Sequence, residues 1–83
     1  MPTYMDVHSF DEGLSAEAVA ESHKVDLAIQ VKYGVEYMRY WVDEKAGKIF
    51  CLVEAPNADA AVAVHMEAHG RTADEIFEVT EGS

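Results

Sequence analysis

The sequence predicts a single α+β domain in which an antiparallel sheet carries two helices on one face. Three observations support this class. Four short stretches have the alternating or β-branched pattern of strands, two stretches have helix caps at both ends, and turn residues separate them. The whole chain, residues 1–83, forms this one domain. A chain of this length buries only about 60% of its unfolded surface, so association with a second copy would supplement its core.

The first expected strand comprises residues 4–10, where polar and apolar side chains alternate. Met5 and Val7 lie on one side of it, and Asp6 and His8 lie on the other. We assign Asp6 and His8 to the sheet face that the helices leave bare. A turn is expected at the next residues, Asp11, Glu12 and Gly13.

The first helix is expected from Ala16 to about Tyr33. Ser15 is a favourable N-cap, and Gly34 readily adopts the left-handed conformation that ends a helix. The apolar stripe that faces the sheet is expected to contain Ala20, Leu27, Ala28 and Val31.

Two strands at residues 35–42 and 49–55 form an expected hairpin around a polar turn at residues 43–48. If Tyr40 lies opposite Cys51, both faces of this hairpin are substantially apolar. One face then carries Met38, Tyr40, Val42, Ile49, Cys51 and Val53. The other face carries Tyr37, Arg39, Trp41, Phe50, Leu52 and Glu54, and it needs a partner.

The second helix is expected at residues 58–69, between Asn57 and Gly70, and a weaker strand follows at residues 73–80. The order of strand, helix, strand, strand, helix, strand is the split βαβ pattern of the ferredoxin-like fold, with both helices on one face of the sheet. The bare face would carry Phe10, Tyr37, Trp41, Phe50 and Leu52. Because monomers rarely expose such an apolar patch, we expect a homodimer that packs sheet to sheet.

The charge of the chain restricts its partners. Sixteen acidic residues against six basic ones leave a formal charge of −10, which repels nucleic-acid phosphate and anionic lipid. We therefore expect neither a nucleic-acid nor a membrane partner. No apolar run approaches the roughly 20 residues that span a bilayer, and no secretory signal is recognisable. With its one cysteine, which fits a reducing compartment, the chain is expected to be cytoplasmic.

Two histidines, His65 and His69, lie four residues apart at the end of the second helix. At this spacing both imidazoles leave one helix face, one turn apart, where they can chelate one metal ion. The alternative is that they pack against the core or cap the helix. The zinc-protease motif is excluded, because Met66 follows the first histidine where that motif has the glutamate that acts as general base.

The other two histidines are weaker metal candidates. His23 and Asp26 share a helix side and form a second candidate at the surface, with an ordinary ion pair as the alternative. His8, beside Asp6, is the third candidate, and the alternative is burial in the dimer interface. For Cys51 we favour a buried, inert thiol over a thiolate ligand, because its strand neighbours are apolar.

The stretch from Gly34 to Pro56, GVEYMRYWVDEKAGKIFCLVEAP, followed by HMEAHG, resembles a small actinobacterial family of nickel-binding, ferredoxin-like proteins that was formerly a domain of unknown function. The preceding LSAEAVAESHKVDLAIQVKYG resembles the first helix of that family, so the resemblance covers almost the whole chain. It implies a homodimer that binds Ni(II), with a role in nickel sequestration or tolerance rather than catalysis. The ligands remain our own inference from side-chain chemistry: surface histidines together with carboxylates.

Two other functions compete with metal binding. One is an enzyme of the dimeric α+β-barrel kind that acts on a small molecule. A deep pocket lined by Tyr40, histidine and carboxylate would favour it, whereas a filled core would count against it. The other is a purely structural dimer whose histidines are incidental. The choice among nickel, copper, zinc and cobalt stays open, because copper has the highest affinity at almost any such site. The sequence also leaves open whether a site bridges two subunits.

Overall fold

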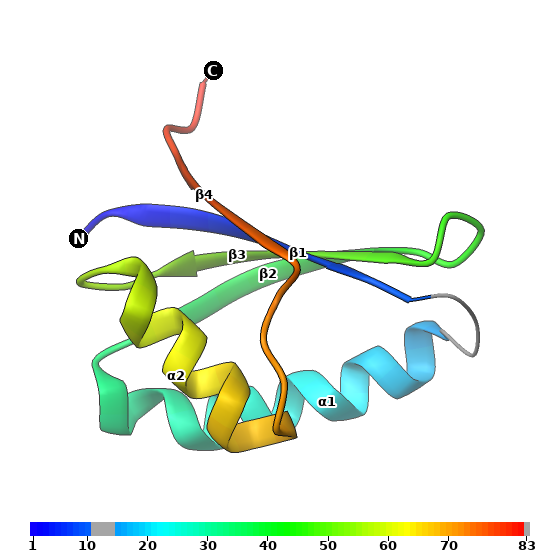
Figure 1. Ribbon diagram of the computed structural model, residues 1–83, viewed down its shortest axis with the longest axis horizontal. Coiled ribbons are helices and arrows are strands. Elements are labelled where there is room, and N and C mark those ends of the chain that lie inside the picture. Colours follow the sequence, from blue (N-terminus) through cyan, green and yellow to red (C-terminus); the bar gives the residue numbers. More distant parts are fainter. Residues whose placement is uncertain (11–14, 83) are drawn as a thin grey trace.

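The computed structural model describes residues 1–10 and 15–82, and the expected turn at residues 11–13 lies outside them. Its elements follow in the order β1 (Thr3–Ser9), α1 (Ala16–Ile29), the 3₁₀ helix η1 (Gln30–Tyr33), β2 (Glu36–Asp43), β3 (Lys48–Glu54), α2 (Ala58–His69) and β4 (Glu75–Val79). The strands form one antiparallel sheet in the order β2-β3-β1-β4, and both α-helices lie on the same side of it (Figure 1). This arrangement confirms the α+β class and is consistent with the ferredoxin-like fold.

The helix boundaries follow from the capping residues that the sequence contains. The side-chain oxygens of Ser15 and Asn57 accept hydrogen bonds from backbone N–H groups in the first turns of α1 and α2, at 3.1 and 2.9 Å. Gly34 and Gly70 adopt left-handed φ angles of 67° and 72°. As a result α2 ends at His69, as expected.

The register of the hairpin is the expected one, but a bulge changes which face Tyr37 occupies. Tyr40 pairs with Cys51, and a register shift between Tyr37 and Arg39 interrupts the alternation along β2. Tyr37 therefore joins the core and is 3% exposed, while Met38 is turned outward. The assignments of Tyr37 to the bare face and of Met38 to the other face were wrong for this reason.

The inner side of β1 is also opposite to the one that the sequence suggested. Asp6 and His8 are buried, and both make hydrogen bonds to His65 of α2, so they face the helices. Phe10, which follows β1, packs against the same core. The assignment of Asp6, His8 and Phe10 to the bare face was wrong, because β1 is a central strand whose helix-facing side carries polar residues paired with one another.

Helix α1 is rotated relative to the expected apolar stripe. Its buried residues are Val19 and Asp26, whereas Leu27 is 40% and Val31 82% exposed. A buried aspartate would be costly without partners, and two histidines of α2 supply them. The prediction that an apolar stripe of α1 faces the sheet was wrong, because the carboxylate of Asp26 occupies one of the positions that face inward.

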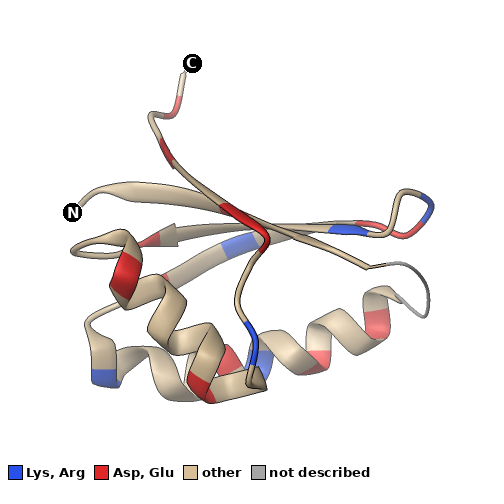
Figure 2. Cartoon of the chain, viewed as in Figure 1, with Lys and Arg blue, Asp and Glu red and all other residues tan. Residues whose placement is uncertain are grey.

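The rest of the molecule separates into a filled core and an apolar outer sheet face. The core between sheet and helices contains Tyr4, Val19, Val35, Tyr37, Ile49, Cys51, Val53, Ala55, Ala61 and Val64. On the outer face Met38, Trp41 and Phe77 are 42 to 49% exposed. Acidic positions are distributed over both helices and the sheet rather than collected at one place (Figure 2). Within the described residues, no helix is long and apolar enough to cross a membrane.

Candidate metal centre

His65 lies at the centre of a polar group between the sheet and the helices. It projects from α2 toward the sheet beside the fully buried Val64, and it is itself 3% exposed. Its two ring nitrogens have different partners: Nε2 lies 3.0 Å from Asp6 Oδ2, and Nδ1 lies 3.0 Å from Asp26 Oδ1. The ring therefore joins β1 to α1 through the two carboxylates.

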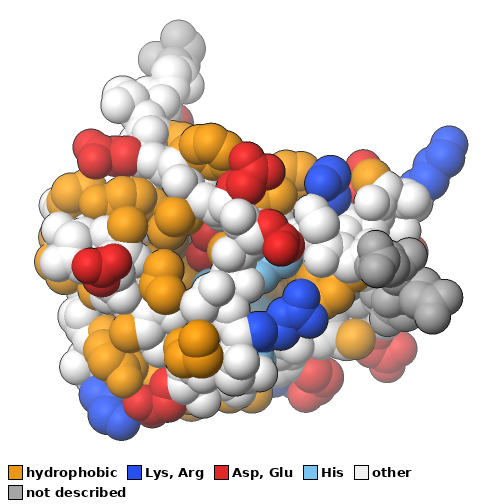
Figure 3. Space-filling model, viewed as in Figure 1, with side chains coloured by type: hydrophobic (Ala, Val, Ile, Leu, Met, Phe, Trp, Pro, Cys, Tyr) orange, Lys and Arg blue, Asp and Glu red, His pale blue; other side chains and the backbone are white. Residues whose placement is uncertain are grey.

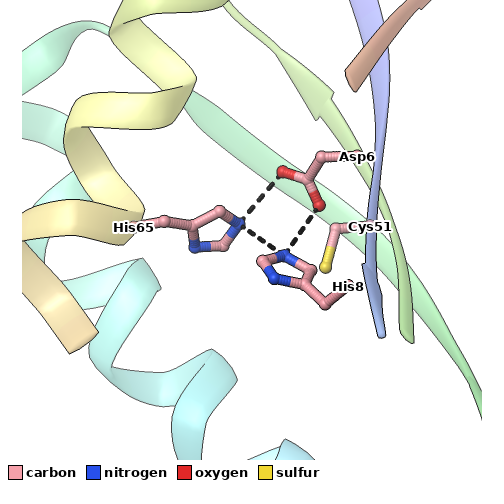
Figure 4. Close-up of side chains that lie close together, drawn as sticks. All are labelled: Asp6, His8, Cys51 and His65. Carbon is pink, nitrogen blue, oxygen red and sulfur yellow. Dashed lines mark hydrogen bonds and ion pairs between the residues drawn. The ribbon is translucent and has the colours of Figure 1, made fainter. Parts of the chain in front are cut away.

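His8 brings a second imidazole to the same place. Its Nε2 lies 3.2 Å from Asp6 Oδ1 and 3.3 Å from His65 Nε2 (Figure 4). The two rings meet edge to face, with centroids 4.7 Å apart. The Cys51 thiol completes a group in which one ligand atom from each residue lies within 4.8 Å of the others. We call Asp6, His8, Cys51 and His65 the inner cluster.

A second group lies nearer the surface. His69 Nε2 is 3.0 Å from the same Asp26 oxygen that His65 Nδ1 contacts, and the His69 side chain is 23% exposed. We call Asp26, His65 and His69 the outer cluster. The two helix-end histidines do lie one turn apart, as the sequence predicted, but Asp26 from α1 stands between them.

His23 does not form the separate surface pair with Asp26 that the sequence suggested. Asp26 is 4% exposed and contacts His65 and His69 instead. The ring of His23 lies against Tyr40, with centroids 4.7 Å apart. The prediction of a surface His23–Asp26 site was wrong, because the rotation of α1 directs Asp26 inward.

Tyr37 supports the inner cluster from β2. Its hydroxyl lies 3.1 Å from Asp6 Oδ2 and 3.2 Å from the carbonyl of Ala61, to either of which it can donate. Burial and the charge of Asp6 raise the pKa of Tyr37, so the phenol stays neutral and acts as a donor. No sequence pattern indicates this role, because only the bulge turns Tyr37 inward.

All four histidines line one cavity of about 200 Å³ between the sheet and the helices. Asp26 and Cys51 line it as well, and Arg71, from the segment between α2 and β4, lies at its wall. Histidine side chains are visible from outside at the bottom of a hollow beside this segment (Figure 3). The three candidates expected from the sequence, the His65–His69 pair, His23 and His8, thus line one cavity.

The comparisons with known proteins agree with this fold. A family model described as "Nickel responsive protein SCO4226-like" matches residues 4–79. The chain belongs to this family. A crystal structure of SCO4226 from Streptomyces coelicolor A3(2) has 37% sequence identity and a TM-score of 0.89, and the match covers 98% of this chain and 99% of that one. No curated protein matches the sequence. The resemblance stated from the sequence is confirmed.

Hydrogen bonds fix the charges of the inner cluster. Burial opposes ionisation of Asp6, but hydrogen bonds from His65 and His8 outweigh it and hold the pKa of that carboxyl well below its usual range. Burial likewise disfavours protonation of His65, yet the carboxylates of Asp26 and Asp6 raise its pKa to about 9. At neutral pH the metal-free protein therefore holds an imidazolium between two carboxylates.

The Cys51 thiol is protonated in this state. Burial, together with the charge of Asp6, raises the pKa of Cys51. This agrees with the expected buried, inert thiol rather than a free thiolate. Among the described residues, every buried polar side-chain atom has a hydrogen-bond partner. In the metal-free cluster, the proton on His65 therefore supplies the positive charge that a metal ion would otherwise bring.

The donor atoms of the inner cluster fit a divalent transition metal. Imidazole nitrogens and a carboxylate suit nickel, copper and zinc. With metal–ligand bonds of about 2.1 Å, neighbouring ligand atoms at right angles lie about 3.0 Å apart. The observed separations among the Nε2 atoms of His8 and His65 and the Asp6 oxygens are 3.0 to 3.3 Å. The contact of Asp26 with His65 Nδ1 is the carboxylate–histidine arrangement that orients metal ligands.

Proposed function

We propose that this protein is a nickel(II)-binding protein that holds the ion at the inner cluster, for sequestration or tolerance rather than catalysis. The observation that carries the proposal is the convergence of His8 Nε2, His65 Nε2 and the buried Asp6 carboxylate within 3.3 Å, beside a cavity that both histidines line. The nickel-responsive family supports the choice of metal. The site lies inside one subunit, instead of on the surface where we first placed it.

Each neighbouring residue has a part in this proposal. Asp26 accepts the Nδ1–H of His65 and thereby keeps Nε2 as the coordinating nitrogen. Tyr37 holds Asp6 in position. His65 must lose its proton when the metal binds, so one positive charge is replaced by two and the two carboxylates remain compensated.

A titration with nickel(II) of two single variants tests which cluster binds. We expect His8→Ala to abolish the saturable uptake seen by isothermal titration calorimetry in the metal-free, tag-free protein, because it removes a ligand of the inner cluster alone. His69→Ala should retain uptake, since His69 belongs only to the outer cluster. His23→Ala, which alters the cavity wall without touching either cluster, is the matched control. The reverse pattern, loss with His69→Ala and retention with His8→Ala, would move the ion to the outer cluster.

We also propose that the protein is a homodimer that packs sheet to sheet. Trp41, Met38 and Phe77 are apolar side chains on the outer face of the sheet, and each is about half exposed. Burying this face would remove apolar area from water at roughly 25 cal/mol per Å². The inner cluster lies on the opposite face of the sheet, so this dimer does not require a metal site that bridges the subunits.

An enzyme acting on a small molecule is the second candidate function. The observation in its favour is the cavity itself, which Tyr40, histidines and the carboxylate of Asp26 line together. This is the lining expected for the dimeric α+β-barrel enzymes. We rank it below metal binding, because the described side chains around the cavity include no activated nucleophile: Cys51 is buried and its pKa is raised.

A further inference from the structure

The cavity beside the inner cluster is larger than a metal ion requires. Its volume is about 200 Å³, whereas one water molecule occupies about 30 Å³ in the liquid. The space is therefore large enough for several waters or one small organic molecule. Each residue of the inner cluster offers one ligand atom, which makes four at most. Further positions around a bound ion would open into this space.

The apolar part of the cavity lining favours an organic occupant over water. Phe10, Val19, Tyr40 and Ile49 all line the cavity, and their side chains are apolar except for one hydroxyl. Water beside such a wall loses hydrogen bonds, whereas a hydrocarbon substituent gains contacts there. The cavity thus combines apolar lining residues with metal-ligating ones.

Arg71 gives the cavity a basic group in an otherwise strongly acidic protein. It is the basic position in the segment between α2 and β4 (blue in Figure 2), and it lines the cavity. Its guanidinium lies over the ring of Phe10, 4.5 Å from the centroid, in a cation–π contact that holds it at the wall. A guanidinium is the preferred side-chain partner of a carboxylate, which it binds through two parallel hydrogen bonds.

We propose that this cavity binds a small organic carboxylate with a second donor on the neighbouring carbon, as in 2-hydroxy and 2-amino acids. Its carboxylate pairs with Arg71, its neighbouring donor reaches the metal, and its substituent packs against Phe10 and Ile49. The inference rests on the proposed function, because the neighbouring donor needs the nickel held by the inner cluster. It extends that function from binding an ion to binding an ion with a small chelating acid.

The test is calorimetric titration of the nickel-loaded protein with L-lactate as the probe. We expect saturable binding that is about tenfold or more tighter than that of propionate, which has the same carboxylate but no hydroxyl. Arg71→Gln should weaken lactate binding by about tenfold or more and leave nickel affinity unchanged, which also shows that the variant is folded. Lys45→Gln removes one positive charge in the exposed turn between β2 and β3, away from the cavity and from the outer sheet face, and should behave as the wild type.

Nickel uptake, measured first and by itself, separates this inference from the proposed function. Uptake of nickel without uptake of lactate overturns the inference and leaves the proposed function intact. Equal binding of lactate with and without nickel also overturns it, because the metal then takes no part. Absence of nickel binding overturns both. Loss of lactate binding in Lys45→Gln to the same extent as in Arg71→Gln would show only a general effect of charge and would also reject the assignment of Arg71.

Discussion

At the residue scale, the behaviour of the site depends on one imidazole. His65 contacts Asp6 through one nitrogen and Asp26 through the other, and its pKa of about 9 reflects these two carboxylates. The ring is therefore charged in the metal-free protein at neutral pH and must become neutral to bind a metal. Protons and metal ions compete for the same nitrogen.

We expect nickel affinity to increase with pH, by up to about tenfold per unit between about pH 6 and pH 9, because one proton must leave His65. The stability of the metal-free protein should change in the opposite direction. The pKa of His65 is raised in the folded state from 6.5 to about 9. Its protonation therefore stabilises the fold below pH 6.5, and this contribution disappears as the pH rises through 9, a loss of at most about 3 kcal/mol.

Calorimetry with nickel and urea unfolding in the presence of a chelator, both at several pH values, measure these two trends. Nickel affinity that stays constant across this range would contradict the role of His65 as a ligand. The lowered pKa of Asp6 affects stability at acidic pH. Because the folded state favours the ionised carboxylate, the free energy of unfolding should fall as the pH decreases below the ordinary carboxyl range.

The residues of the site could be predicted better than the contacts that they make with one another. Sequence spacing identified His65 and His69 as neighbours on α2, and it placed Asp6 and His8 on one side of β1. It did not bring the two pairs together, because hydrophobic alternation assigned the polar side of β1 to the outside. A buried group of mutually satisfied polar residues has no signature in a hydropathy pattern.

At the element scale, the positions of helix caps and turns could be predicted from the sequence. The side of each strand or helix that faces the core could not. Ser15, Asn57, Gly34 and Gly70 mark their helix ends through local chemistry that the sequence displays directly. The inward rotation of α1 depends on Asp26 finding histidines 39 and 43 residues further along the chain. Such long-range pairing is set by the tertiary structure and leaves no local signal.

The turn before β3 provides a test of how the end of β1 is fixed. Gly47 has a φ of 69°, and its carbonyl accepts a hydrogen bond of 2.8 Å from the N–H of Phe10, which lines the cavity. A Cβ at this glycine would collide with the Phe10 carbonyl oxygen, whereas nothing lies within 4 Å of a Cβ at Gly34, where φ is 67°. A substitution at either glycine forces a side chain into a left-handed backbone conformation, and only the substitution at Gly47 also causes a steric clash.

We expect Gly34→Ala to lower the free energy of unfolding by about 1 kcal/mol and Gly47→Ala by about 2 to 3 kcal/mol. Urea unfolding of the two variants beside the wild type measures the difference. Equal losses would mean that the contact between Gly47 and Phe10 is not rigid.

At the scale of the whole molecule, the order of the elements was sufficient to predict the fold. The split βαβ pattern predicted one antiparallel sheet with both helices on one face, and the structure shows this sheet in the order β2-β3-β1-β4. The same reasoning predicts a bare apolar sheet face. The structure leaves Trp41 there, 47% exposed, while Tyr37 and Phe10 belong to the core.

The proposed dimer makes Trp41 the residue whose alteration should change the oligomeric state. We expect Trp41→Glu to convert a dimer into a monomer at micromolar concentration, since a charge would be buried against a second sheet. Val31→Glu introduces the same charge at a position that is 82% exposed near the end of the α1–η1 segment, and it should leave the dimer intact. Sedimentation velocity distinguishes the two states. A wild type that sediments as a monomer would reject the dimer.

The central claim is that the ion lies inside the subunit, between β1 and α2. Anomalous diffraction at the nickel edge from crystals of the nickel-loaded protein tests this directly, because it locates the metal without assuming its ligands. We expect one strong peak per subunit at about 2.1 Å from the Nε2 atoms of His8 and His65, with an Asp6 oxygen at a similar distance. Peaks confined to the exterior of the protein, with the hydrogen bonds of Asp6, His8 and His65 unchanged, would contradict the claim.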